Sequence, residues 1–371
     1  MHGGSQRGQA VRRPSVELKT LRIENLRLFD RLQLDLCPRW NLLTGPNGAG
    51  KTTLLEAAYL LSHGRSFRTS MREALVRHGT SGYAVFGELE TCGIVERLGL
   101  ARGRRLEARR NGEPVTAGEL MRHAAVLCFE PGSHELVAGP AEERRRFMDW
   151  GVFHVEQDFL PVWRRYQRAL RQRNGLLRAQ RGEDLAPWDR ELSLAAAPLA
   201  AMRQRYLDAL RPFVTGVLGD LLVELGPPHL HFDPGFDAGQ PLEVTLAERR
   251  DRDLAHGHTS AGPHRADWNL AFAKAPRREH LSRGQEKLCA FALVMAQAQL
   301  YFAGSGQWPV LCLDDLASEV DAQHQARLVA AVDASGAQVL ATGTEAPAGW
   351  SGLRGPVASF HVEQGRTVRL L

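Results

Sequence analysis

Long uninterrupted apolar runs are missing from this 371-residue sequence. No stretch approaches the roughly 18 uncharged apolar residues that a transmembrane helix needs, so we expect no membrane partner. The first residues, Met1 to Pro14, also lack the apolar core of a secretory signal. We expect a globular chain with a disordered tail over residues 1–14.

Paired cysteine motifs are missing as well. The cysteines lie far apart, without any C-x-x-C pair, and most are in apolar runs; they are Cys37, Cys92, Cys128, Cys289 and Cys312. This spacing argues against a zinc or disulfide framework and predicts reduced thiols, as in a cytoplasmic protein.

Lysine is scarce, and nearly all of the positive charge comes from arginine. Lysine occurs only at Lys19, Lys51, Lys274 and Lys287. The formal net charge is +5, which is compatible with a polyanionic partner but does not require one.

One stretch, Trp40–Thr53, carries the residue types that hold a nucleoside triphosphate. An apolar run that predicts a buried strand leads into G-x-x-x-x-G-K-T, and a helical pattern follows that should stop at Gly64. Backbone N–H groups of such a loop converge on phosphate oxygens at the positive end of the helix. We expect Lys51 to reach the β- and γ-phosphates and the Thr52 hydroxyl to hold Mg²⁺. The predicted nucleotide-binding residues are Gly45, Pro46, Asn47, Gly48, Ala49, Gly50, Lys51, Thr52 and Thr53.

A second apolar run, Pro309–Asp315, predicts a strand that ends in two carboxylates. Asp314 is placed to hold Mg²⁺ opposite Thr52, and Asp315 can orient or deprotonate an attacking water. Both roles require the phosphate loop upstream, which this sequence has.

The run Leu281–Lys287 comes directly before an apolar helix, predicted over Leu288–Tyr301. A serine followed by glycine at a helix start is a geometry that binds anions. An N-cap formed by Ser282 explains the same residues, so both interpretations stay open at this point.

Elsewhere the pattern changes along the chain. Alternating apolar residues predict paired strands over Glu17–Leu36 and further strands over Gly82–Glu90 and Gly93–Arg102, and Asn111-Gly112 signals a hairpin. Two long helical stretches follow, Glu142–Gln180 and Pro187–Leu225, which we expect to pair as an inserted helical part.

Two arginine clusters have a structural and a functional interpretation. One surrounds the Asn111-Gly112 turn, where charge commonly protects the edge of a sheet. The other is a stripe on the first long helix, which fits a solvated face or a DNA track. The stripe consists of Arg164, Arg165, Arg168, Arg171 and Arg173.

The order of these motifs is that of the ABC-type ATPase superfamily, and several strings resemble the RecF family of bacterial recombinational DNA repair proteins. The resemblance runs from about Leu18 to the last strand. Its carriers are G-P-N-G-A-G-K-T with L-L-E-A-A-Y-L-L, G-R-S-F-R-T, F-E-P, E-R-R-R-F-M-D, G-P-H-R-A-D-W, S-R-G-Q-E-K and L-D-D-L-A-S-E-V-D.

The resemblance implies an α/β fold: an ABC-type P-loop ATPase lobe with an inserted α-helical second lobe. We expect the ATPase lobe over residues 15–140 and 227–371 and the helical lobe over 141–226. Family members are ATP-dependent homodimers, in which Ser282, Gly284 and Gln285 would act on the nucleotide of the other protomer. Asp321 would lie in a loop at that interface, and Asp315 would take the catalytic position.

The family further implies binding of ATP and Mg²⁺, weak DNA-stimulated ATP hydrolysis, and binding of single-stranded and gapped DNA together with RecR and RecO. It also implies a nucleoid-associated place in the cytoplasm and a role in the SOS response. Two features depart from the wider superfamily. Thr342-Gly343-Thr344 stands where a phosphate-sensing histidine is expected, and no glutamine between the lobes is identifiable near Phe129-Glu130.

Two other classes share the nucleotide motifs. For a transporter subunit the interval from Lys51 to Ser282 is long, and the basic helical insertion has no membrane-facing use. An SMC-type ATPase that organises chromosomes needs hundreds of coiled-coil residues between the same motifs. Neither class fits the spacing of this sequence.

Overall fold

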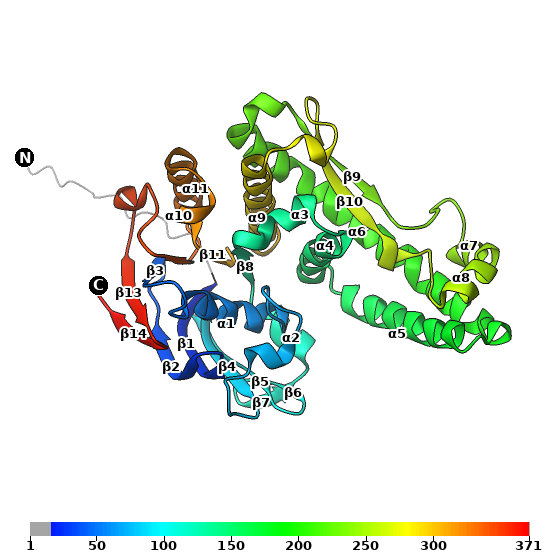
Figure 1. The fold of residues 1–371 in the computed structure, drawn as a ribbon, viewed down its shortest axis with the longest axis horizontal. Helices are drawn as coiled ribbons and strands as arrows, with labels where there is room; N and C mark the ends of the chain where they lie inside the picture. Colours follow the sequence, from blue (N-terminus) through cyan, green and yellow to red (C-terminus); the bar gives the residue numbers. More distant parts are fainter. Residues whose placement is uncertain (1–15, 371) are drawn as a thin grey trace, which may run out of the picture. The chain divides into compact units, whose positions relative to one another are not determined.

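The computed structural model describes residues 16–370, so the predicted tail over residues 1–14 lies outside the described residues. The chain divides into two units, each with its own packing (Figure 1). The first unit contains residues up to 128 and from 305 onward, and the second unit contains Phe129–Gly304.

The first unit is built on two sheets, and alternation and apolar runs predict several of their strands but not β8, β13 or β14. The antiparallel sheet has the order β2-β1-β4-β5-β6-β7 and the other sheet β14-β13-β3-β12-β11-β8. The strands are β1 Glu17–Leu26, β2 Phe29–Asp35, β3 Trp40–Thr44, β4 Tyr83–Thr91, β5 Ile94–Arg102, β6 Leu106–Arg110, β7 Glu113–Val115, β8 Val126–Phe129, β11 Val310–Leu313, β12 Val339–Gly343, β13 Val357–Glu363 and β14 Arg366–Arg369. Its helices are α1 Lys51–His63, α2 Ala117–Arg122, α10 Leu316–Glu319 and α11 Ala322–Ser335.

Strand β3, which leads into the phosphate loop, lies at the centre of the second sheet. It pairs in parallel with β12 and β13, and β12 pairs in parallel with β11. The carboxyl ends of β3 and β11 therefore point to the same edge of the sheet, which is where open α/β sheets bind ligands. This topology places the phosphate loop and the paired carboxylates at one edge, although they are far apart in the sequence.

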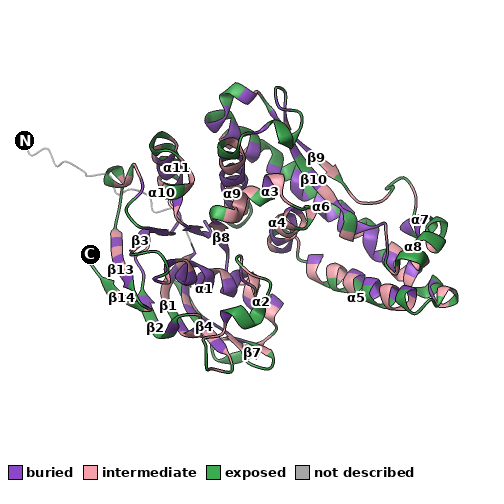
Figure 2. Cartoon of the chain, viewed as in Figure 1, coloured by how far each residue is buried: buried purple, intermediate pink, exposed green. Residues whose placement is uncertain are grey.

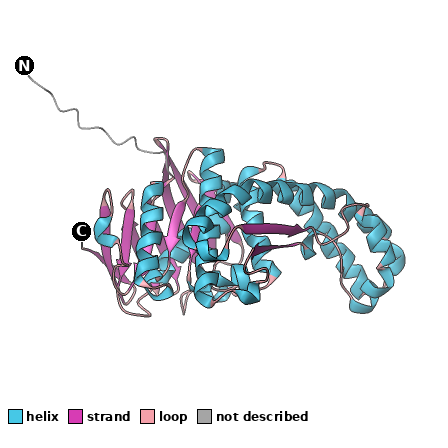
Figure 3. Cartoon of the chain, turned by 90° about the horizontal axis from the view of Figure 1, so that it is seen from above, coloured by secondary structure: helices cyan, strands magenta, loops and turns pink. Residues whose placement is uncertain are grey.

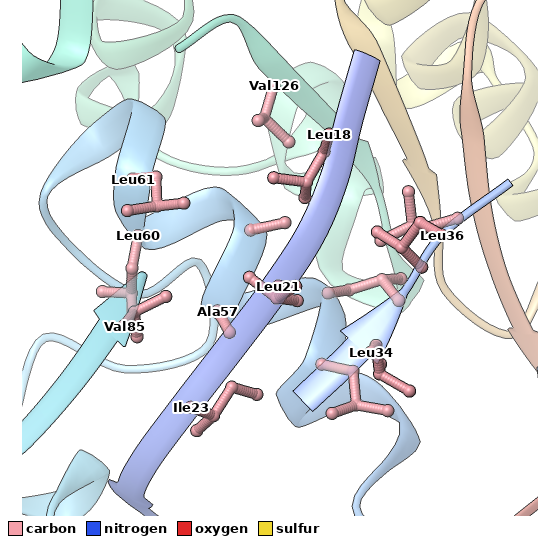
Figure 4. Close-up of a cluster of buried hydrophobic side chains, with 14 of the residues drawn as sticks. Leu18, Leu21, Ile23, Leu34, Leu36, Ala57, Leu60, Leu61, Val85 and Val126 are labelled. Carbon is pink, nitrogen blue, oxygen red and sulfur yellow. The ribbon is translucent and has the colours of Figure 1, made fainter. Parts of the chain in front are cut away.

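Helix α1 joins the two sheets through its apolar residues. Leu60 and Leu61 pack with Leu18 and Leu21 of β1 and with Val85 of β4 (Figure 4). Helix α1 ends at Gly64, whose φ is 64° and whose N–H donates to the carbonyl of Leu60, as the sequence predicts. The same cluster includes Leu54 and Leu55 near the start of α1 and Leu340 of β12, so burial fixes the start of α1, and with it the phosphate loop, against both sheets.

The second unit is mostly helical and contains one pair of strands (Figure 3). Its elements are α3 Glu135–Ala138, α4 Ala141–Val155, α5 Phe159–Arg178, α6 Ala186–Leu221, β9 Pro228–Asp233, α7 Leu242–Glu248, α8 Arg250–His256, β10 Asp267–Phe272 and α9 Arg283–Ser305. Helix α6 continues across Pro198 and Pro212, and α5 packs along it as expected.

This division differs from the predicted boundaries, which ended the helical lobe at residue 226. Strand β9 packs on α6, and β10 packs on α4. Gln297 of α9 donates hydrogen bonds to the carbonyl of Phe147 (3.0 Å) and to the hydroxyl of Tyr206 (2.7 Å). These contacts tie residues 227–304 to the helices, and of the chain after residue 226 only the residues from 305 onward belong to the unit of the two sheets.

Helix α9 is long and apolar enough by composition to cross a membrane. This differs from the prediction that no stretch of the sequence approaches the length and composition of a transmembrane helix. The residues of α9 from Leu288 to Ala298 are buried in the second unit. Burial inside the protein's own core is the behaviour of a core helix, and it accounts for the apolar composition of α9.

The predicted arginine stripe on α5 is only partly a solvated face. Arg164, Arg168 and Arg171 are exposed, whereas Arg173 is completely buried and pairs with Asp189 and Asp253. Figure 2 shows buried and exposed stretches alternating along α5. Arg173 is a core residue because α6 and α8 supply its carboxylate partners.

The packing of α4 on α6 generates a prediction with a matched control. A Cβ at Gly151 would lie 2.0 Å from the Tyr206 ring, whereas a Cβ at Gly175 of α5 meets nothing within 4 Å. Alanine is normally the better helix residue by about 1 kcal/mol. We expect Gly175→Ala to raise the free energy of unfolding by up to about 1 kcal/mol and Gly151→Ala to lower it by about 1–3 kcal/mol through overpacking. Urea unfolding of both variants is the measurement, and equal midpoints would contradict this packing.

Candidate nucleotide-binding site

The phosphate loop needs glycine where β3 ends. Gly45 has φ 151°, and a Cβ there would lie 2.1 Å from the carbonyl oxygen of Val362 on β13. Gly50 has φ 105°, and a Cβ there would press on the Phe29 ring at 2.8 Å. No other residue fits either position, because the loop runs directly against neighbouring elements. Helix α1 then begins at Lys51.

Lys51 is buried, while Pro46, Asn47 and Gly48 of the loop are exposed. Its Nζ donates to the carbonyl oxygens of Gly45 (2.7 Å) and Pro46 (3.0 Å). Desolvation lowers the pKa of Lys51, and the charges of Asp315 and Asp314 act in the opposite direction. The lysine is therefore held within its own loop and close to the acidic pair.

Asp314 connects the three segments that meet at the sheet edge. Its Oδ1 accepts hydrogen bonds from the hydroxyls of Thr52 (2.9 Å) and Thr342 (2.6 Å). Burial raises the pKa of Asp314, whereas the two threonine hydroxyls and the charge of Arg68 lower it. The two threonine hydroxyls hold the Asp314 carboxylate next to Thr52, so the two predicted ligands of Mg²⁺ are neighbours.

The oxygen atoms of Thr52 and Asp314 suit Mg²⁺, which binds through one or two protein oxygens together with phosphate and water. Between residues 16 and 370 no group of three His, Cys, Asp or Glu side chains is arranged as a metal site. A cation here would therefore depend on the nucleotide for its other ligands.

Asp315 follows in a backbone conformation that is uncommon for a residue with a side chain. Its φ is 52° and ψ 42°, a left-handed conformation that aspartate tolerates better than most residues. The backbone N–H donates to the carbonyl oxygen (3.1 Å) and the hydroxyl (3.0 Å) of Thr342, and Oδ2 accepts from the Ser318 hydroxyl (2.8 Å). The carboxylate is thus placed by strand β12 and the start of α10.

Thr342 occupies the segment where the sequence lacks the histidine of the wider superfamily. Its hydroxyl donates to Asp314 and accepts from the N–H of Asp315. A threonine can do both because a hydroxyl is donor and acceptor at once. In place of a residue that senses phosphate, the first unit has one that joins the Asp314 carboxylate to the backbone of Asp315.

Sequence reasoning missed a buried network behind the phosphate loop. Glu56 of α1 is fully buried and accepts two hydrogen bonds from Arg27, at 2.5 and 2.8 Å. It also accepts from the Ser66 hydroxyl, which in turn accepts from the N–H groups of Arg68 (2.9 Å) and Thr69 (3.1 Å). This network fixes the loop that brings the Arg68 charge towards Asp314. The available signal was one glutamate within an otherwise apolar stretch of helix.

The predicted signature residues lie in the second unit, at the start of α9. The N–H of Gln285 donates to the Ser282 hydroxyl (3.3 Å), and the N–H of Ser282 donates to Oε1 of Gln285 (3.0 Å). This reciprocal pair is a capping box, so the helix-cap interpretation is correct for the chain by itself. Ser282 and Gly284 are also exposed, so both are accessible to another molecule.

Asp321 is an exposed N-cap of α11. Its Oδ1 accepts from the N–H groups of Gln323 and His324, both at 3.0 Å, and its Oδ2 lies 2.6 Å from Nδ1 of His324. Hydrogen bonds from His324 lower the pKa of Asp321. Glu130, near the expected position of the missing glutamine, caps the 3₁₀ turn Pro131–His134.

Comparison with known proteins gives a consistent result. Residues 17–349 match the family model described as the RecF/RecN/SMC N terminal domain. The chain is 45% identical over 363 residues to the DNA replication and repair protein RecF of Stenotrophomonas maltophilia, covering 95% of this chain and 99% of that protein. It is 41% identical over 359 residues to RecF of Azotobacter vinelandii, covering 95% and 98%.

Solved structures show the same fold. A structure described as the recombination mediator protein RecF with ATPrS, in the RecFOR pathway, matches with a TM-score of 0.86 and 24% identity, covering 97% of this chain and 99% of that chain. An Smc head domain of Pyrococcus furiosus matches with a TM-score of 0.57 and 12% identity, covering 96% of each chain. The predicted ABC-type ATPase fold is therefore confirmed.

Proposed function

Because this chain belongs to the RecF family of ABC-type ATPases, we propose that it is an ATP-driven clamp on DNA in recombinational repair and replication restart. The observation that carries this proposal is the meeting of Lys51, Thr52, Asp314 and Asp315 at one edge of the second sheet. Those residues account for the binding of ATP and Mg²⁺. The proposal that the partner is DNA rests on the family, whose members are named for DNA replication and repair.

ATP binding begins with the backbone of Gly45–Thr53. The N–H groups at the start of α1 point to phosphate oxygens, and Lys51 exchanges its contacts with the Gly45 and Pro46 carbonyls for the β- and γ-phosphates. The Thr52 hydroxyl and the Asp314 carboxylate would hold Mg²⁺, and a bound Mg²⁺ would neutralise charge on the phosphates.

Hydrolysis requires a water aligned with the bond that breaks. Asp315 orients this water and accepts its proton as the water oxygen bonds to the γ-phosphorus, and the electrons of the broken P–O bond stay on ADP. The Asp315 carboxylate is one methylene shorter than glutamate, and Thr342 supplies no imidazole. We therefore expect turnover below the roughly 1–10³ s⁻¹ that is typical of enzymes.

The exposed start of α9 supports a role across a dimer. Ser282, Gly284 and Gln285 would contact the ATP that a second copy holds, and Asp321 would lie at the same interface. The capping box already places the Ser282 hydroxyl and N–H at a helix N-terminus, where an anion is stabilised. ATP would then close two copies around DNA, and slow hydrolysis would release it.

The wider role follows the family. We expect binding to single-stranded and gapped DNA, cooperation with RecR and RecO in loading recombinase, and support of the SOS response. The place of action would be the cytoplasm, at the nucleoid, and hydrolysis would be stimulated by DNA.

Replacement of Ser282 tests the dimer. Ser282→Arg should leave ATP binding by the monomer nearly unchanged and prevent ATP-dependent dimerisation, because the bulky cation would occupy the space of the other protomer's nucleotide. Ser282→Asn is the matched control, since asparagine caps a helix about as well as serine. Fluorescent ATP titration and sedimentation velocity measure the two properties. If Ser282→Arg lost monomer binding as well, the residue would have only a structural role.

Replacement of Asp315 tests the purpose of hydrolysis. Asp315→Asn removes the base and keeps Asp314, so it should trap an ATP-bound dimer that holds DNA for longer. Stopped-flow dissociation from labelled DNA, started with excess competitor, measures this. Equal off-rates for the wild type and Asp315→Asn, while the wild type hydrolyses ATP, would show that hydrolysis is not the release step.

A further inference from the structure

The loop Thr259–Ala266 of the second unit is unusually well fixed, although the chemistry of ATP does not use it. It contains most of the string G-P-H-R-A-D-W, one of the carriers of the family resemblance. The Tyr166 hydroxyl donates to Nδ1 of His264 (2.6 Å), and Nε2 of His264 donates to the carbonyl of Thr259 (3.0 Å). Gly262 has φ 127°, and a Cβ there would lie 2.5 Å from the Tyr166 oxygen. The loop therefore has one defined shape.

Three buried or half-buried arginines around this loop are neutralised by carboxylates. Arg144 binds Asp267 at 2.7 and 2.9 Å, and Arg203 binds Asp149 at 2.8 and 2.9 Å. Arg203 also donates to the carbonyl of Pro263 (2.6 Å). The third pair, Arg173 with Asp253, lies behind the loop. These pairs hold the loop, and each of the three arginines has at least one carboxylate partner.

Two further arginines, Arg145 and Arg265, have no such partner. Across residues 16–370, neither side chain forms an ion pair with a carboxylate. Nη1 of Arg145 donates to the carbonyl of Ala266 (2.7 Å), and Nη2 of exposed Arg265 makes one long contact with the carbonyl of Thr259 (3.4 Å). Both cations thus contact main-chain carbonyls of the Thr259–Ala266 loop, one near each end.

The surroundings favour an anion at this place. Desolvation and the nearby charge of Arg203 lower the pKa of Arg145, and the charges of Asp267, Glu142 and Asp149 act in the opposite direction. Burial, together with the charges of Arg265 and Arg145, lowers the pKa of His264 to about 4. His264 is therefore neutral at pH 7, and Arg145 and Arg265 are the cations beside the loop that form no ion pair. A bound anion would give both an ionic partner.

We propose that Arg145 and Arg265 bind the phosphate backbone of DNA, presented by the rigid Thr259–Ala266 loop. This inference rests on the proposed DNA-binding function and assigns residues to it. A planar guanidinium matches phosphate in two hydrogen bonds, and Arg145, already held by the Ala266 carbonyl, loses little freedom on binding. Contacts to phosphate carry no base information, which suits a protein that recognises the form of DNA rather than its sequence.

The test compares Arg265→Gln with a matched control, Arg252→Gln, which removes one exposed positive charge from α8. Arg265→Gln should weaken binding of a gapped duplex about tenfold, and the salt dependence of log K should lose about one unit of slope. Arg252→Gln should leave both nearly unchanged. Arg145→Gln should act like Arg265→Gln, and Arg145→Lys should restore part of the affinity. Fluorescence anisotropy over a salt series measures all four.

The outcomes separate this inference from the proposed function. If the wild type fails to bind any DNA, the proposed function is wrong. If the wild type binds and Arg265→Gln binds with the same affinity and slope, only the assignment of this loop is wrong. An equal loss in Arg252→Gln would also overturn it, because the effect would then be one of net charge. A second ATP bound per chain and lost in Arg265→Gln would show that the site takes a free nucleotide instead.

Discussion

The site depends on one carboxylate oxygen, Oδ1 of Asp314, which accepts hydrogen bonds from Thr52 and Thr342. These two bonds join the ends of β11 and β12 to the first turn of α1. A buried carboxylate is stable only when donors compensate for its lost hydration. The same bonds therefore hold the sheet edge together and orient the group that would bind Mg²⁺. Arg68 adds a positive charge from a loop that Glu56 fixes.

The second unit uses paired buried charges in a different way. Arg173, Arg203 and Arg144 each bind an aspartate from another element, and these pairs hold the helices and the Thr259–Ala266 loop. Removal of one partner from such a pair leaves a buried charge and costs several kcal/mol, so the arrangement is specific. The unit is therefore rigid where the unpaired Arg145 and Arg265 lie. On the proposed function, the first unit would bind and hydrolyse the nucleotide, and the second presents an exposed helix start and the Thr259–Ala266 loop.

Much of this could be predicted from local pattern. Alternation located β1, β2, β4 and β5, and Asn111-Gly112 marked the turn between β6 and β7, with φ 51° and 90°. The phosphate loop and the strand before Asp314 could be predicted because the residues that carry their chemistry are neighbours in the sequence. Sequence reasoning failed where a partner far away in the sequence determines whether a residue is buried or paired. Arg173 resembled a surface residue because its partners, Asp189 and Asp253, lie on α6 and α8. Strand β10 was missed since its partner β9 comes more than thirty residues earlier, and Glu56 gave no sign of binding Arg27.

On the proposed function, ATP binding rather than hydrolysis closes the protein on DNA. The test is a titration of gapped, single-stranded and blunt duplex DNA with the Asp315→Asn chain, with and without ATP. We expect tighter binding with ATP, most strongly on gapped DNA, and no effect of ATP on a chain that also carries Lys51→Met. Equal affinity with and without ATP on all three DNA forms would contradict it.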